Sequence, residues 1–275
     1  MNHHEEQTMN IITVTNQKGG VGKTTVSVHL ACGLAERGYK TLLVDLDGQG
    51  QASTHLTGDT AINRRPNGGA ELLFDLEKLK AGVSPLNTPL GVDLLFGHNA
   101  LSRIDEGECT TGDAMDVRDY VRALPYDFIV IDTPPAMQLR QLAAVLWADR
   151  LITVIEPEEK AVAGWTRVRD MIKAASAKGL LVDGFQAKVL LNRVDSRIAD
   201  QRNAVKQMKA AVPGMIDTVL TARQAVVSTA YSSRLPIWHL KKDKVDADYA
   251  ALWRDLPIAI GLTERVHPST VTEVA

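Results

Sequence analysis

Short apolar runs alternate with stretches of helical periodicity along most of the chain. Such alternation is typical of βαβ units, in which helices cover both faces of a parallel sheet. Seven apolar runs predict strands, the last one only weakly: Ile11–Thr15, Thr41–Asp45, Val92–Phe96, Phe128–Asp132, Leu151–Ile155, Ala187–Leu191 and Ile216–Leu220. We therefore expect an α/β fold with a mostly parallel, twisted sheet flanked by helices.

Amphipathic helices are expected between these strands. The clearest is Gln138–Ala148, where apolar residues recur every three to four positions. A second should run over Lys160–Ala177, with Val162, Trp165 and Ile172 buried, and a third over Asp246–Leu256, ending or kinking at Pro257. The stretch Thr57–Gly69 is rich in Gly, Asn, Arg and Pro and predicts a loop.

The first predicted strand leads directly into a glycine-rich segment and then into a helical pattern. This is the setting of a phosphate-binding loop, whose backbone N–H groups surround a polyphosphate. In such a loop Lys23 would neutralise phosphate charge and the Thr24 hydroxyl would bind Mg²⁺. The candidate nucleotide-binding residues are Gln17, Lys18, Gly19, Gly20, Val21, Gly22, Lys23, Thr24 and Thr25.

Two predicted strands end in aspartate. The second is followed by Asp45-Leu46-Asp47-Gly48-Gln49, and the fourth ends in Asp132-Thr133-Pro134-Pro135. Ligands of open α/β sheets bind beyond the carboxyl ends of the strands, and an apolar strand ending in Asp is typical of a magnesium-holding segment. Either aspartate alone has a simpler explanation as a turn residue, but with the phosphate-binding loop they indicate a nucleotide site.

Composition fits a single globular domain. The chain has 275 residues, of which 45% are hydrophobic and 23% are charged. Its two cysteines, Cys32 and Cys109, have no partner at metal-ligand spacing, so we expect neither zinc nor a disulfide framework. We expect a polar leader over 1–10 without a signal peptide, one domain over 11–262, and a frayed tail over 263–275.

The string K-G-G-V-G-K-T-T at 18–25 resembles the deviant Walker A motif of the ParA/MinD family of P-loop ATPases. In that family the extra lysine reaches the phosphates bound by the partner of a nucleotide-sandwich dimer. The resemblance implies that Lys18 acts across the dimer and that Lys23 binds phosphate within its own subunit. An added positive charge there would stabilise the transition state of phosphoryl transfer.

The aspartate segments carry the same resemblance. V-D-L-D-G-Q is similar to the family's switch I motif, with Gly48 in place of the usual proline, and I-D-T-P-P matches its Walker B and switch II segment. The resemblance implies that Asp47 positions the attacking water and that Asp132 serves the magnesium shell. Candidate metal-site residues are thus Thr24, Asp47 and Asp132, with Asp45 in a supporting role. We expect Gly48 to loosen the switch backbone.

The residues alone do not decide whether the bound base is adenine or guanine. The segment Asn192-Arg193-Val194-Asp195 approximates the guanine-reading N-K-x-D motif of GTPases, and Asp195 has a second reading as a helix cap. The family resemblance instead makes Asn192 an adenine-reading residue. We therefore favour ATP with Mg²⁺ over GTP.

Charge is distributed unevenly along the chain. Residues 188–244 hold eleven basic and four acidic residues, a balance of +7, within a chain of net charge −2. Arg202, Lys206 and Lys209 share one face of a predicted helix around Ala199–Ala211. We call these three residues the basic stripe. The stripe suits contacts with DNA phosphates, although a solvated helix face explains it nearly as well. Arg223 is a further candidate DNA contact by loose resemblance.

These observations predict a ParA-type partition ATPase of the cytoplasm, associated with the nucleoid. The resemblance implies an ATP-bound homodimer, non-specific DNA binding, and a ParB-like partner that stimulates hydrolysis. We expect no membrane contact, because the tail lacks a basic amphipathic helix. The alternatives are an ATP-dependent metabolic or maturation enzyme on the same scaffold, or a ParA-like ATPase that positions a protein complex.

Overall fold

The structure, a computed structural model, describes residues 10–65, 68–136, 138–158 and 161–264, with the backbone alone at 161–164. Its described strands form one sheet in the order β3-β4-β2-β5-β1-β6-β7-β8. Every neighbouring pair is parallel except β3 and β4. The strands are β1 (Asn10–Thr15), β2 (Thr41–Asp45), β3 (Leu86–Asn87), β4 (Asp93–Leu95), β5 (Phe128–Asp132), β6 (Arg150–Ile155), β7 (Gln186–Val194) and β8 (Met215–Thr221).

Helices connect the strands and cover both faces of the sheet. Short 3₁₀ helices (η1, Ile62–Arg64; η2, Ala70–Phe74; η4, Ile237–His239) and a π turn (η3, Ile104–Glu108) lie in the connections. The α-helices are α1 (Lys23–Ala35), α2 (Gln51–Thr57), α3 (Leu76–Ala81), α4 (Leu101–Arg103), α5 (Thr111–Asp116), α6 (Arg118–Arg122), α7 (Leu139–Trp147), α8 (Ala161–Ala177), α9 (Ala199–Ala211), α10 (Gln224–Ser233), α11 (Ala247–Arg254) and α12 (Leu256–Ala259).

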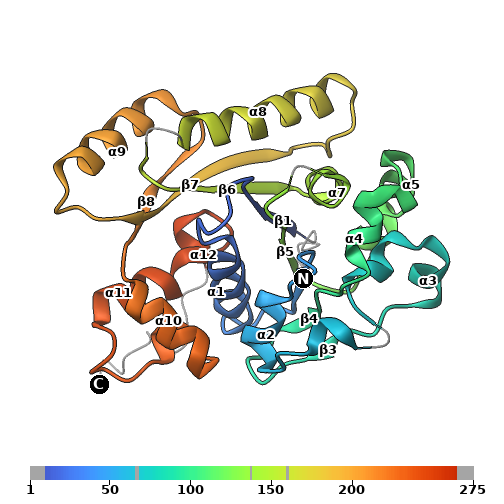
Figure 1. Cartoon of the computed structure of the whole chain (residues 1–275), viewed down its shortest axis with the longest axis horizontal. Coiled ribbons are helices and arrows are strands. Elements are labelled where there is room, and N and C mark those ends of the chain that lie inside the picture. Colours follow the sequence, from blue (N-terminus) through green and yellow to red (C-terminus); the bar gives the residue numbers. More distant parts are fainter. Residues whose placement is uncertain (1–9, 66–67, 137, 159–160, 265–275) are drawn as a thin grey trace, which may run out of the picture.

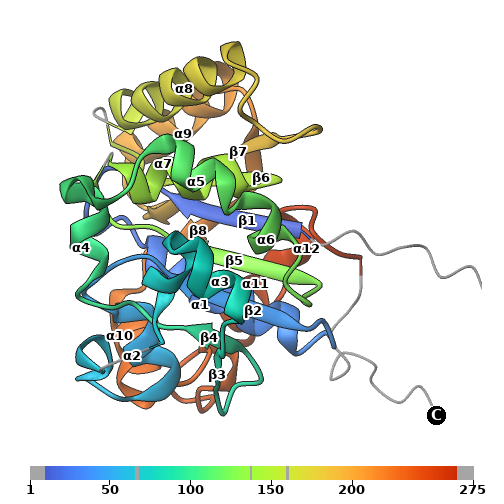
Figure 2. The same cartoon turned by 90° about the vertical axis from the view of Figure 1, so that its right-hand side faces the viewer.

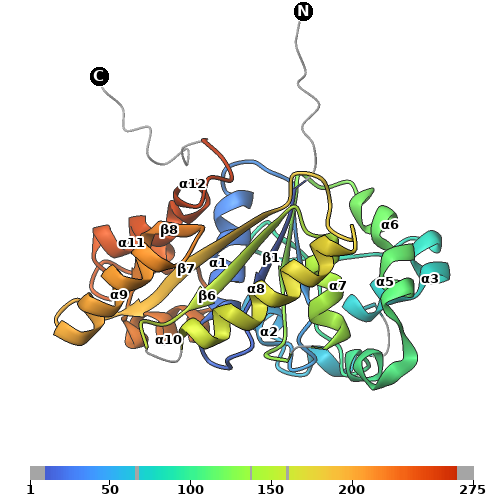
Figure 3. The ribbon, with the colours of Figure 1, turned by 90° about the horizontal axis from the view of Figure 1, so that it is seen from above.

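The sheet lies between two helical layers (Figure 1). One layer contains α1, α2 and α10–α12, and the other contains α5 and α7–α9; Figure 2 shows β1 and β5 between them. Alternation along the strands explains this arrangement, because Ile12 of β1 joins the core under α1 whereas Ile11 joins the core under α7. A third cluster packs α8 and α9 on β6 and β7, where both helices lie over the sheet (Figure 3).

The pairing register brings distant polar residues to one edge of the sheet. Asp45 of β2 pairs with Asp132 of β5, and Val14 of β1 pairs with Asp132 on the other side. The glycine-rich loop leaves β1 at the same edge. The carboxyl ends of β2, β5 and β1 therefore face a common space, as expected for a ligand site in an open parallel sheet.

The predicted α/β class and the seven predicted strands are confirmed, with ends shifted by up to three residues. Strand β3 was not predicted. The third predicted helix is divided, because α11 ends at Arg254 and α12 begins at Leu256 with Pro257 in its first turn. The predicted loop at Thr57–Gly69 contains η1.

The predicted boundaries need two adjustments at the ends of the domain. Asn10 already belongs to β1. Thr263 was predicted to be frayed, but it is buried and its hydroxyl lies 2.5 Å from Tyr39 Oη. The rest of the predicted leader (1–9) and most of the predicted tail (265–275) lie outside the described residues, as does the side chain of Val162. Within the described ranges, no helix combines the length and apolar character that crossing a bilayer requires.

Candidate functional site

The glycine-rich loop connects β1 to α1 in a conformation that needs glycine at two positions. Gly20 and Gly22 have φ angles of 79° and 96°, in the left-handed region. At Gly22 an added Cβ would also lie 2.3 Å from Asn192 Nδ2. Helix α1 begins directly after Gly22, so its N-terminal N–H groups and positive dipole end face the space beyond β1. This geometry suits a bound anion.

Lys23 lies between the glycine-rich loop and the two aspartate segments. Its side chain is buried, and Nζ donates a long hydrogen bond of 3.4 Å to the carbonyl oxygen of Lys18. Burial lowers the pKa of Lys23, while the charges of Asp132 and Asp47 raise it. A buried ammonium group with so weak a hydrogen bond suits the phosphate-binding role predicted for it.

Asp132 has the properties of a carboxylate prepared for a metal ion. Its Oδ1 accepts a hydrogen bond of 2.9 Å from the Ser27 hydroxyl, whereas its buried Oδ2 has no hydrogen-bond partner among the described residues. Burial raises the pKa of Asp132 to about 6, against hydrogen bonds from Thr24 and Ser27 and the charge of Lys23, which lower it. Among the described residues, no group of three acidic, His or Cys side chains is placed to hold a metal ion. Mg²⁺ is usually held by one or two carboxylates together with phosphate and water, and Asp132 offers one such carboxylate.

Asp45 and Asp47 differ in surroundings. Asp45 is buried and accepts hydrogen bonds from the Ser53 amide (3.0 Å), the Ser53 hydroxyl (2.6 Å) and the Asp47 amide (3.1 Å). Burial and the charge of Asp132 raise the pKa of Asp45 well above its usual range. Asp47 is partly exposed and accepts a hydrogen bond from the Gln49 amide. Asp45 therefore shapes the segment that carries Asp47, which agrees with its predicted supporting role.

The segment after β2 is anchored despite its glycine. The Asn63 side chain donates a hydrogen bond of 3.1 Å to the carbonyl oxygen of Gly48. A Cβ added at Gly97 would lie 2.2 Å from the carbonyl oxygen of Asp47, so the chain after β4 passes close to this segment. The expected loosening at Gly48 stays a prediction.

Lys18 contacts carboxylates of its own chain. Its ammonium group lies 2.7 Å from Glu156 and 2.7 Å from Glu158, directly after β6. Glu156 also pairs with Arg193 at 3.0 Å. Hydrogen bonds with both glutamates raise the pKa of Lys18, whose side chain is 49% exposed. The contacts of Glu156, Glu158 and Arg193 with this site were not predicted from the sequence, because they depend on β6 being the neighbour of β1.

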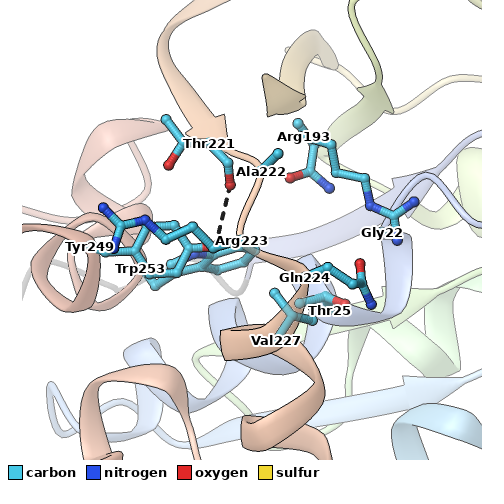
Figure 4. A pocket seen from close by; sticks show the side chains of 11 residues that line it. Gly22, Thr25, Arg193, Thr221, Ala222, Arg223, Gln224, Val227, Tyr249 and Trp253 are labelled. Atoms are coloured by element: carbon cyan, nitrogen blue, oxygen red, sulfur yellow. Dashed lines mark hydrogen bonds between the residues drawn. The ribbon is translucent and has the colours of Figure 1, made fainter. Parts of the chain in front are cut away.

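Asn192 lies beside the glycine-rich loop and donates a hydrogen bond of 2.7 Å to the carbonyl oxygen of Val21. It borders a cavity of about 160 Å³ between the loop and the β8–α10 connection (Figure 4). Tyr249 and Trp253 of α11 form its aromatic wall, and the Tyr249 hydroxyl donates to the carbonyl oxygen of Thr221. The cavity suits a flat ring beside a phosphate site.

Asp195 does not border this cavity. Its carboxylate is held by Arg197, through Nε at 2.9 Å and Nη2 at 2.7 Å. Hydrogen bonds from Arg197 lower the pKa of Asp195 to about 2. Because Asn192 borders the cavity and Asp195 does not, the geometry favours the adenine interpretation.

The basic stripe is exposed on α9, while Met208 of the same helix and Val212 directly after it are buried. Arg202 donates to the carbonyl oxygens of Ser196 and Arg197, and Lys209 donates to that of Asp217. Arg223 lies elsewhere: it pairs with Asp246, stacks 4.6 Å from the centre of the Tyr249 ring and borders the base-sized cavity. The structure therefore does not join Arg223 to the stripe.

Several known proteins resemble this chain in sequence or in fold. Residues 9–180 match a family model described as an AAA domain. The chromosome partitioning protein ParA of Myxococcus xanthus is 32% identical over 262 residues, which is 90% of this chain and 87% of that protein. McdA of Cyanothece, solved as an aspartate-to-alanine variant in complex with ATP, has a TM-score of 0.75 at 20% identity, covering 94% of this chain and 99% of that one.

A metabolic enzyme has a similar fold. Cobyrinic acid a,c-diamide synthase of Mycobacterium smegmatis, solved with ADP and magnesium, has a TM-score of 0.68 at 24% identity. The match covers 82% of this chain and 91% of the synthase chain. At this level of identity both structural matches establish the fold alone.

Proposed function

Because the chain belongs to the ParA-type family of P-loop ATPases, we propose that it is a partition ATPase in which Mg·ATP controls a DNA-binding dimer. The observation that carries the proposal is the position of Lys18, a second lysine at the rim of the phosphate site with a half-exposed side chain. The phosphate site already has Lys23 within it, so Lys18 could serve a second nucleotide if it leaves its own carboxylates.

Each residue of the site has a defined part in this proposal. Lys23 and the loop amides bind the triphosphate, and Asn192 lies beside the cavity for adenine. Thr24 and Asp132 would hold Mg²⁺, which neutralises phosphate charge when bound. Asp47 positions the attacking water, since it is the partly exposed carboxylate next to Lys23.

Dimer formation would require Lys18 to exchange partners. In the single chain its charge is balanced by Glu156 and Glu158, and in the dimer it would meet the partner's triphosphate. Exposed ion pairs of this kind contribute only about 0–1 kcal/mol, so a triphosphate of higher charge can compete for the lysine. Hydrolysis followed by release of phosphate would remove the charge of the γ-phosphate and return the lysine to its own carboxylates.

The dimer would then bind DNA without sequence readout. The balance of +7 over residues 188–244 and the exposed basic stripe support this part of the proposal. A ParB-like protein on the cargo DNA would stimulate hydrolysis and release the dimer in the cytoplasm, over the nucleoid. Membrane contact is not part of the proposal.

The test is the variant Lys18→Ala, with Lys178→Ala at an exposed position directly after α8 as the matched control. We expect Lys18→Ala to lose the ATP-dependent dimer in light scattering and the stimulated hydrolysis, while most of its nucleotide affinity remains. The control should behave as the unmodified protein. Dimers and stimulated turnover that survive in Lys18→Ala would overturn the proposal. Turnover that depends on a small substrate instead of DNA would favour the metabolic alternative.

A further inference from the structure

The peptide group between Leu46 and Asp47 is held at both of its polar atoms by side chains. The carbonyl oxygen of Leu46 accepts a hydrogen bond of 2.8 Å from Arg140 Nη1. On the other side of the peptide bond, the Asp47 amide donates to Asp45 Oδ1 at 3.1 Å. Rotation of this peptide would break both bonds, so its orientation, and with it the starting direction of the Asp47 side chain, is fixed.

Arg140 is buried, and its guanidinium donates hydrogen bonds from both Nε and Nη1. Its side chain is 10% exposed and that of its partner Asp105 is 4% exposed. Arg140 Nε donates to Asp105 Oδ2 at 2.6 Å while Nη1 reaches Leu46. A planar guanidinium donates hydrogen bonds to two partners from fixed positions, whereas a lysine ammonium on its flexible side chain holds two such partners less rigidly. Burying such a charge is costly unless it is paired, and Asp105 supplies the partner here.

The contacts of Arg140 also join three elements of the site. Arg140 lies in the first turn of α7, which follows the strand that carries Asp132, and its backbone N–H donates to Asp105 Oδ1 at 3.1 Å. Asp105 therefore satisfies a free N–H at the start of α7 from the separate turn η3. The Leu46 amide in turn donates to the carbonyl oxygen of Asp132 at 2.9 Å. The segment with Asp47 is thus tied to the segment with Asp132.

We propose that Arg140 is a positioning residue for ATP hydrolysis, which fixes the Leu46–Asp47 peptide so that the Asp47 carboxylate holds its place relative to the phosphate site. The proposal rests on the role of Asp47 proposed above. Arg140 touches neither nucleotide nor water in this account. Asp105 is its partner and sets the plane of the guanidinium.

The test compares Arg140→Gln with Arg37→Gln. Arg37 is a matched control, because it too is a buried arginine that donates to a carbonyl (Gly33, 2.8 Å) and an aspartate (Asp255, 2.8 Å), but it lies at the far end of α1. We expect Arg140→Gln to lower kcat for ATP about tenfold or more, since small misplacements of catalytic groups have effects of this size. ADP affinity should stay unchanged. Arg140→Lys should recover only part of kcat.

Both glutamine variants should lose thermal stability, so stability alone does not decide the matter. A kcat for Arg140→Gln equal to that of Arg37→Gln would overturn the proposal, as would an equal loss of kcat and ADP affinity. If Arg140→Gln fails to fold, Asp105→Asn provides the second variant with the same expected split. The variant Asp47→Ala distinguishes failure of the proposed function from failure of the positioning role. An unchanged kcat in Asp47→Ala would reject the role of Asp47. A loss of kcat in Asp47→Ala together with an unchanged kcat in Arg140→Gln would reject only the positioning role of Arg140.

Discussion

At the scale of single residues, the buried carboxylate of Asp132 combines a cost in stability with the metal-binding role proposed for it. It lies almost fully buried, with one oxygen bonded to Ser27 and the other without a partner among the described residues. A buried charge without full hydrogen bonding destabilises the folded state. The cost makes sense if a cation occupies this position during turnover, because the metal then supplies the missing interaction.

Replacement of Asp132 by Asn should therefore stabilise the protein at neutral pH while it abolishes Mg²⁺-dependent hydrolysis. The folded pKa is about 6, above the usual value near 3.9. The unfolded chain loses this proton first, so the folded state becomes less stable as pH rises from about 4 to 6. Without Mg²⁺, we expect Asp132→Asn to raise the free energy of unfolding by ~1–3 kcal/mol at pH 7.5, and by almost nothing near pH 4.

Urea unfolding of the unmodified and substituted proteins at the two pH values measures this difference. Asp113→Asn is the contrasting control, since hydrogen bonds from Thr110 lower the pKa of that exposed capping residue. It should lose stability at pH 7.5. A loss of stability for Asp132→Asn at pH 7.5 would contradict the burial argument.

Residues of the site differ in how readily sequence reveals them. The loop residues from Gln17 to Thr25 are contiguous, so the sequence alone reveals them as a phosphate-binding motif. Glu156, Glu158 and Arg140 are far from that string and reach the site only through the strand order. Their roles depend on which strand ends are neighbours, and one sequence does not fix that order.

At the scale of elements, prediction succeeded where burial imposes a period. Six of the seven predicted strands are largely buried apolar runs, whereas β8 is buried only at Ile216 and Leu220, and α9 has the predicted bounds. Strand β3 was not predicted because its two residues are too few to show a repeat of apolar and polar positions. The short helices between Ala70 and Arg122 likewise lack a repeated apolar pattern, since they cover the sheet edge in pieces. Local propensity without periodicity is too weak to predict such segments.

The exposed face of α9 allows a direct test of the DNA contact. Neutralising the stripe as Arg202→Gln, Lys206→Gln and Lys209→Gln together should weaken ATP-dependent DNA binding. Each lost phosphate contact should reduce the slope of log affinity against log salt by about 0.9. Binding to a random-sequence duplex, measured over a series of salt concentrations, gives both quantities.

The matched control removes three exposed charges from the other end of the molecule, as Lys78→Gln, Lys80→Gln and Arg103→Gln. It changes net charge equally, so a general electrostatic effect would appear in both variants. If the stripe variant binds with the affinity and salt slope of the control, the stripe is a solvated helix face.

At the scale of the whole molecule, the phosphate-binding loop and the basic excess lie in different parts of the sequence, although Arg193 and Arg223 border the base-sized cavity. The phosphate site lies at the carboxyl ends of β1, β2 and β5, whereas the basic excess lies over residues 188–244. The remainder of the chain must carry −9 to give the net charge of −2. A nucleotide that joins two such chains would double the basic surface offered to DNA, which links occupancy of the site to DNA affinity.

In the proposed function, this link would make the lifetime of the DNA complex depend on hydrolysis. If Asp47 positions the attacking water, Asp47→Ala should still bind ATP and dimerise but should remain on DNA, because the charge that holds Lys18 across the dimer is not removed. We expect its dissociation after an excess of competitor DNA to be as slow as that of the unmodified protein with a non-hydrolysable ATP analogue. The double variant Lys18→Ala/Asp47→Ala should lose retention altogether, since no dimer forms. Release of Asp47→Ala at the unmodified protein's rate with ATP would show that hydrolysis does not control the complex.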